Sequence, residues 1–383
     1  MKERFYSLDV FRGATVALMI LVNNPGSWAH IYPPLQHASW HGLTPTDLVF
    51  PFFLFAVGNA MAFVIPRLRT QGDVSFWKKV LKRSFLIFGI GLLLHWFPFI
   101  RLDADGNIVY RELSRLRIFG VLQRIAVCYF VASIIVYYLK PKSALWVSVI
   151  LLVLYWGLCV LGNPADPYSL SGWFGTAIDT QILGTAHMYK GEGIPFDPEG
   201  PMSSLAAIVQ VIFGYLVGHY IVSKGKTAEM LNGLFVAGTA FVFLGFCWDM
   251  VFPINKKIWT SSYTIYTTGL AMLVIAVMIY WIEFKQKKTI FSRFFDVFGK
   301  NALFIFVLSG ALPRLLSLIR IPGEISASGK PVYHTPFNWF YVYICKPLFE
   351  DPRNSSLLYA LCFIGMMWFL AWLLDKKKIY IKV

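Results

Sequence analysis

Ten long apolar runs constrain this chain more than any other feature of its sequence. The chain is 57% hydrophobic and 14% charged, well below the roughly 25% charged residues of a soluble domain. Each run approaches the roughly 20 residues that a helix needs to cross a bilayer, where it satisfies its own backbone groups. We therefore predict an all-α polytopic membrane protein, a single domain over 1–383. Its ten transmembrane helices are expected near 10–24, 48–65, 84–98, 118–139, 144–162, 204–222, 231–251, 262–283, 301–320 and 355–373.

Lys and Arg are unevenly distributed between the loops on the two sides of these runs. The larger set lies on the side of both termini, which predicts cytoplasmic N- and C-termini. Cytoplasmic loops facing anionic lipid also explain the net charge of +15 without nucleic acid. The long loops 163–203 and 321–354 then lie outside, as does 25–45, which has no Lys, Arg, Asp or Glu. We expect the functional site toward this outer face.

Polar residues mark both ends of the first apolar run. Asp9 and Arg12 interrupt the stretch 2–22, which favours a membrane span over a signal peptide. The two residues share a helix face, so they can form a local ion pair or bind a ligand. At the far end, Asn23 and Asn24 fit a helix C-cap and leave one amide to point inward.

Arg124 lies well inside a later run, next to Gln123. An arginine at this depth is costly unless it meets an anion or a buried partner, and its forked geometry suits a phosphate or a carboxylate. Arg117 precedes it and extends the basic character. For Asp249 the sequence favours a buried ion pair, and for Asn301 it favours a helix N-cap over a binding role.

The stretch "HASWHGLTPTD" places two histidines and an aspartate directly before the second run. His37 and His41 have the i, i+4 spacing of some zinc sites, but no third ligand follows, so no metal is expected. The five cysteines lack paired spacing and predict neither a disulfide framework nor a zinc site. A neutral imidazole can instead act as a base or accept an acyl group, or simply lie at the interface. Asp47 fits a helix N-cap, with direct chemistry as the alternative.

An ordered set of motifs extends this picture over residues 4 to about 310. These are "SLDVFRG", "LMILVNNPG", "HASWHGLTPTDLVFPFFLFAVG", "GVLQRIAVCYF", "PFDPEG", "INKKIWTSSYTIYTTGLA" and "GKNALFIFVLSG". Together they resemble the heparan-α-glucosaminide N-acetyltransferase family of transmembrane acyltransferases. The chain resembles a bacterial-type homologue without the lumenal N-terminal domain of the lysosomal member.

This resemblance implies an acyltransferase that moves acetyl from cytoplasmic acetyl-CoA to a glucosamine-type amino group on the periplasmic side of the inner membrane. The family's active histidine maps to His37 and its "VN" asparagine to Asn23, with a longer spacing between them here. Asp47 maps to the aspartate of "DLVFP". His37 is expected to act as a base or acetyl acceptor, Asn23 to support the oxyanion, and Asp47 to orient His37. The acetyl-CoA site is expected among Arg124, Gln123, Arg117, Asp9, Arg12 and Asn301.

Two other functions remain open from the sequence. An O-acetyltransferase of a surface or cell-wall polysaccharide would use the same donor and base. A solute transporter would also place polar groups within spans, although no repeat relates the two halves of the chain. Besides acetyl-CoA and the glycan acceptor, the expected partners are membrane lipid and a second copy in a homodimer.

Overall fold

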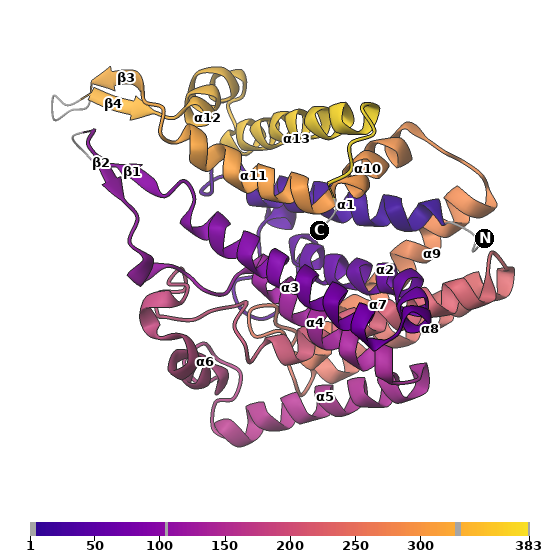
Figure 1. The fold of residues 1–383 in the computed structure, drawn as a ribbon. Coiled ribbons are helices and arrows are strands. Elements are labelled where there is room, and N and C mark those ends of the chain that lie inside the picture. The colour runs from indigo at the N-terminus through magenta and orange to yellow at the C-terminus, as the bar shows by residue number, and fades with distance from the viewer. Residues whose placement is uncertain (1–4, 104–105, 326–330, 382–383) are drawn as a thin grey trace.

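The computed structural model describes residues 5–103, 106–325 and 331–381, and it is predominantly helical (Figure 1). Within these ranges, two antiparallel hairpins accompany the helices: β1 (Ile100–Leu102) with β2 (Ile108–Tyr110), and β3 (Ile321–Ile325) with β4 (Pro331–His334). The α-helices are α1 (Tyr6–Asn23), α2 (Val49–Gln71), α3 (Asp73–Trp96), α4 (Val121–Tyr138), α5 (Pro141–Gly162), α6 (Gly175–Leu183), α7 (Ser204–Lys224), α8 (Ala228–Asp249), α9 (Ser261–Ile279), α10 (Ile290–Lys300), α11 (Ala302–Leu316), α12 (Pro336–Trp339) and α13 (Pro352–Lys376).

Every predicted apolar run falls on one of these helices, and the all-α fold is confirmed. By length and composition, eight helices of the described chain can cross a membrane. A ninth span requires α10 and α11 together, and these two helices are bent by 81° at their junction. The remaining predicted span, 84–98, lies in α3, which is not among the eight helices that are long and apolar enough to cross a membrane. Its helix extends back through a basic segment that contains Lys78, Lys79, Lys82 and Arg83.

The centre of the bundle is the close pairing of α2 with α7. A Cβ atom at Gly58 of α2 would lie 2.0 Å from the backbone oxygen of Val211, and one at Gly214 would lie 2.2 Å from that of Phe55. Small residues at such positions let two membrane helices approach closely enough for backbone contact. Both helices are mostly buried, whereas α5 and α8 are mostly exposed and form part of the outer surface. The segments that precede α2 and α7 in the chain therefore start from two helices in close contact.

Both hairpins, α6 and α12 gather at the end of the bundle away from the N-terminus (Figure 1, left). We call this end the hairpin end. The loops 25–45 and 163–203, both predicted to lie outside, meet the loop 250–260 between α8 and α9 through contacts of Lys256 with His37 and of Lys257 with Ser39 and Glu192. The structure thus brings together, at one end, loops that are far apart in the sequence.

Candidate functional site

His37 and Asp47 form a hydrogen-bonded pair at the hairpin end. His37 Nδ1 lies 2.7 Å from Asp47 Oδ1. The carboxylate is almost fully buried, with 1% of its side chain exposed, whereas 41% of the imidazole is exposed. The sequence favoured the aspartate as a cap and the histidine as a reactive group, and one contact joins the two.

The sequence placed Asp47 at a helix N-cap, whereas the structure has Thr44 at the N-cap of the short helix Pro45–Leu48 and Asp47 as its partner in a capping box. Asp47 Oδ2 accepts hydrogen bonds from the Thr44 backbone N–H and hydroxyl, both at 3.1 Å, and from the Ala38 N–H at 3.0 Å. A short 3₁₀-helix, Pro45–Leu48, leads from this capping box into α2. Because Oδ2 is held by the backbone, Oδ1 is fixed in position toward His37. The capping box therefore also orients the histidine.

Lys256 completes a triad of charged and titratable groups. Its Nζ lies 3.3 Å from Asp47 Oδ1 and 2.9 Å from His37 Nδ1. Since Nδ1 cannot donate to the carboxylate and accept from the ammonium at once, we assign the proton to Nδ1, facing the stronger acceptor. Nε2 then has a free lone pair. Burial lowers the pKa of Lys256, against the opposing effect of Asp47.

His41 lies outside this arrangement. Its ring is exposed, and its Nδ1 lies 3.4 Å from the Asn255 amide nitrogen. Two histidines that the residue pattern alone left equivalent are thus separated by geometry. Only His37 faces the cavity described next.

A cavity of about 310 Å³ opens beside His37 and is formed by loops from four parts of the chain. Charged side chains and aromatic rings both line it. They include His37, Asp47, Arg117, Arg124, Glu199, Lys256 and Lys257, with the rings of Trp40, Tyr189 and Trp259. The cavity therefore combines a base, cations and ring faces in one enclosed volume.

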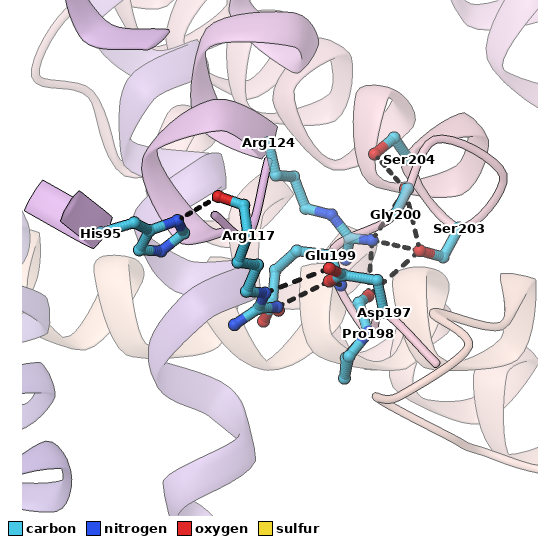
Figure 2. Close-up of polar contacts among 9 residues, drawn as sticks. All are labelled: His95, Arg117, Arg124, Asp197, Pro198, Glu199, Gly200, Ser203 and Ser204. Atoms are coloured by element: carbon cyan, nitrogen blue, oxygen red, sulfur yellow. Dashed lines mark hydrogen bonds and ion pairs between the residues drawn. The ribbon is translucent and has the colours of Figure 1, made fainter. Parts of the chain in front are cut away.

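Arg117 forms one wall of this cavity and is held by two carboxylates (Figure 2). It donates to Asp197 at 2.6 and 3.1 Å and to Glu199 at 2.5 Å. Burial opposes the charge on Glu199, but Arg117 and Arg124 outweigh it and hold the pKa of Glu199 below its usual value. The predicted phosphate ligand Arg117 thus has its charge compensated by the "PFDPEG" loop.

Arg124 is buried, 1% exposed, and lines the cavity from α4. Its guanidinium donates to the Pro198 oxygen at 2.6 Å and to the Ser203 hydroxyl (Figure 2). It also lies 5.0 Å from the ring centre of Trp259. Its Nε and both amide atoms of Gln123 are buried without a hydrogen-bond partner among the described residues. A buried guanidinium with a spare donor is suited to hold an anion or an oxygen of a ligand.

The other predicted site residues lie elsewhere. Asp9 and Arg12 form a 2.8 Å ion pair in the first turns of α1, beside a separate cavity of about 290 Å³. Asn23 ends the same helix, roughly 21 Å further along its axis, and is exposed. It does not line the His37 cavity. Its oxyanion role and the donor-binding role of Asp9 and Arg12 therefore stay predictions.

Asn301 occupies the N-cap position of α11, as the sequence favoured, but its side chain does not cap that helix. Its amide donates to the Ile379 oxygen at 3.0 Å and accepts from the Ile381 N–H at 2.8 Å. It thus holds the C-terminal segment. The expected role of this residue toward acetyl-CoA has no support from these contacts. The sequence predicted a buried ion pair for Asp249. In the structure its Oδ1 instead accepts a hydrogen bond from the Ile254 N–H, at 2.5 Å.

Sequence reasoning missed Lys256, Lys257 and Glu199 as site residues. The available signal was the position of the two adjacent lysines in a short loop on the side that is otherwise poor in basic residues. Lys257 lies 2.6 Å from Glu192 and donates to the Ser39 oxygen at 2.7 Å, so it ties three loops together.

Asp179 of α6 gives the hairpin end a pH-dependent stability. It accepts from the Met202 N–H at 3.0 Å, but its other oxygen is buried without a partner among the described residues. Burial raises its pKa to about 7. Because the folded state holds this proton more tightly than the unfolded state, stability is lost as pH rises from about 4 to 7.

We expect Asp179→Asn to remove this loss. The variant should melt higher than the parent at pH 8, by roughly 2–4 °C for each kcal/mol recovered, and its advantage should shrink toward pH 5. Thermal unfolding in detergent at both pH values measures the difference. An equal shift at pH 5 and pH 8 would show that the charge of Asp179 is not the cause.

Comparison with known proteins agrees with the motifs. Residues 4–182 match the family model described as heparan-alpha-glucosaminide N-acetyltransferase, catalytic. The heparan-alpha-glucosaminide N-acetyltransferase of Mus musculus is 24% identical over 443 residues, which cover all of this chain and 61% of the mouse protein. That of Homo sapiens is 27% identical over 79% of this chain and 52% of the human protein. The chain thus spans between half and two thirds of the length of these relatives.

The matched segment contains His37, Asp47, Arg117 and Arg124, whereas Lys256 and Glu199 lie beyond it. The resemblance predicted from the ordered motifs is confirmed: residues 4–182 match the catalytic family model, and the chain is similar to the mouse and human heparan-α-glucosaminide N-acetyltransferases over most of its length.

Proposed function

We propose that the protein transfers acetyl from acetyl-CoA to the amino group of a glucosamine-type sugar, with His37 as the reactive base. The observation that carries this proposal is the His37–Asp47 pair at the cavity, with a free Nε2 lone pair. The names of the mouse and human relatives supply the reaction class. They do not supply the acceptor of this chain, which is proposed on chemistry.

In the proposed reaction, His37 Nε2 removes a proton from the acceptor amine. The amine nitrogen attacks the thioester carbonyl, a C–N bond forms, and the C–S bond breaks as the thiolate leaves. The thiolate then receives the proton from the imidazolium, which restores the starting state. In a two-step alternative, Nε2 itself accepts the acetyl group before the amine attacks. Asp47 stabilises the charged ring in both routes.

The cavity residues fit an acetyl-CoA donor. Arg124 has a buried Nε–H without an acceptor among the described residues. The amide of Gln123, its neighbour in sequence, is likewise unsatisfied, but it lies against Gly91 of α3 and does not line the cavity. Buried donors of this kind cost free energy until a ligand oxygen meets them. We assign Arg124 to the donor side of the site and the exposed face of His37 to the acceptor side.

The proposed orientation has both termini in the cytoplasm and the hairpin end on the periplasmic side of a bacterial inner membrane. It is supported by the excess of Lys and Arg in the loops near the termini. Acetyl-CoA made inside would then meet an acceptor outside. To test this orientation, a cysteine is introduced into the loop 163–203 and its labelling from outside is measured in intact cells.

A reconstitution experiment tests the activity. The purified protein is incubated with labelled acetyl-CoA and a panel of amino sugars and neutral polysaccharides, and label on the sugar is counted. We expect stable amide product on glucosamine-type acceptors. Base-labile product would instead establish O-acetylation, which the same histidine could catalyse. Absence of label on every acceptor, with uptake of a sugar into proteoliposomes, would favour a transporter.

A further inference from the structure

A second cavity at the hairpin end has no role in the proposed chemistry. It encloses about 520 Å³, and five arginines line it: Arg101, Arg111, Arg115, Arg117 and Arg314. They come from the first hairpin, the segment that follows it, and α11. We call this cavity the arginine pocket.

Among the described residues, most of this positive charge has no carboxylate partner. Arg111 donates to the oxygens of His95 and Phe97, at 3.3 and 3.1 Å, and Arg314 donates to the Leu94 oxygen at 2.9 Å. These acceptors are neutral carbonyls. Among the described residues, the only carboxylate that lines the arginine pocket is Glu112.

That carboxylate is only weakly engaged. Glu112 lies 3.5 Å from Arg115, and both side chains are largely exposed. Arg117 is neutralised by Asp197 and Glu199, on its other side. The remaining guanidinium groups therefore hold a net positive charge around one open pocket. Like charges gathered in this way repel one another unless an anion enters.

The arginine pocket adjoins the His37 cavity. Arg117 lines both. In Figure 2 it lies between His95, a residue of the arginine pocket, and the carboxylates that face Arg124. The Arg117 backbone oxygen contacts His95 Nδ1 at 2.9 Å while its guanidinium binds Glu199. Arg117 therefore forms a wall that the two cavities share.

Two aromatic rings add a surface for a planar or ring-shaped group. Trp96 and Tyr110 line the arginine pocket, and Tyr110 is exposed. Guanidinium groups bind phosphate, sulfate and carboxylate through paired hydrogen bonds. An arginine cluster beside an exposed ring is therefore suited to an acidic group attached to a sugar or a nucleotide.

We propose that the arginine pocket is an anion subsite of the active site, which holds a phosphate, sulfate or carboxylate group of a substrate while its reactive end lies at His37. This proposal rests on the proposed function for the identity of the substrates. The anion has two sources, either the phosphates of the acetyl donor or an acidic group on the acceptor glycan. The proposed orientation puts the arginine pocket on the acceptor side and so favours the acceptor, and the experiment distinguishes the two sources.

The test uses the double variant Arg101→Gln/Arg115→Gln. Both side chains are exposed, and neither holds a buried contact among the described residues, so the fold should persist. The matched control is Arg353→Gln, which removes an exposed arginine that pairs with Asp351 and does not line the arginine pocket. Steady-state rates are measured with acetyl-CoA or acetyl-pantetheine, which lacks the nucleotide, and with neutral or acidic amino-glycan acceptors.

We expect the double variant to raise KM about ten-fold for one substrate, with kcat changed less than two-fold. If the donor supplies the anion, KM rises for acetyl-CoA and not for acetyl-pantetheine. If the acceptor supplies it, KM rises for the acidic acceptor and not for the neutral one. Unchanged KM values for all four substrates would overturn the proposal.

Direct binding separates this proposal from the proposed function. Calorimetry in detergent measures how tightly pyrophosphate and a sulfated disaccharide bind to the parent protein, the double variant and the control. Binding at least ten-fold weaker in the double variant alone supports the subsite even if no acetyl transfer is found. Equal binding to all three proteins overturns it even if the transferase activity is real.

Discussion

Replacing His37 with alanine is expected to reduce acetyl transfer by at least 10³-fold, with little change in folding. The imidazole is largely exposed and makes its close contacts to Asp47 and Lys256, so its removal leaves no gap in the apolar core. General base catalysis typically contributes about 10²–10⁴-fold, and loss of an acyl-accepting nucleophile costs more. Acetylated sugar formed per minute at saturating donor measures the effect.

The control for this experiment is His41→Ala. His41 stands four residues away in the same loop, has the same side chain and does not line the His37 cavity. We expect its activity to remain within about three-fold of the parent, because truncation of an exposed side chain usually has small effects. Full activity of His37→Ala, or an equal loss in both variants, would exclude His37 as the reactive group.

The helices were predictable because each depends on local sequence. An apolar run of the right length must be helical in lipid, and the "TPTD" segment had the residues of an N-cap. The ends and crossings were less predictable. The α3 helix continues through Lys78 to Arg83, since side chains of this length can reach the membrane surface while the backbone stays helical. The 81° bend between α10 and α11 lies at Asn301, whose side chain contacts the C-terminal segment far along the chain.

The site was only partly predictable because its contacts are long-range. His37, Asp47, Arg117 and Arg124 stood out as polar groups beside or within apolar runs, and the structure places all four at one cavity. Lys256, which lies 219 residues from His37, had no local signal that linked it to the histidine. The same holds for Glu199, whose pairing with Arg117 requires the 163–203 loop to fold back over α4.

Replacing Asp47 with asparagine is expected to reduce turnover by about 10²–10⁴-fold while the site keeps its shape. An asparagine amide at this position would donate to His37 Nδ1, so the ring proton would move to Nε2 and the base would be lost. A comparable exchange in a Ser-His-Asp triad costs about 10⁴-fold. The histidine would also lose the carboxylate that stabilises its charged form. Turnover per folded molecule, measured with the same assay, gives the magnitude.

The capping role of Asp47 is separated from its chemical role by Thr44→Val. This variant removes the hydroxyl that donates to Asp47 Oδ2 and keeps the carboxylate beside His37. Loss of an N-cap side chain costs roughly 0.5–2 kcal/mol of stability, so we expect a lower melting temperature with less than ten-fold loss of turnover. Asp47→Asn should show the opposite pattern, because the amide oxygen of asparagine can still accept from the Ala38 and Thr44 N–H groups. If Asp47→Asn instead melts lower and turns over normally once folded, the aspartate acts in the capping box alone, and its carboxylate is not needed for the reactivity of His37.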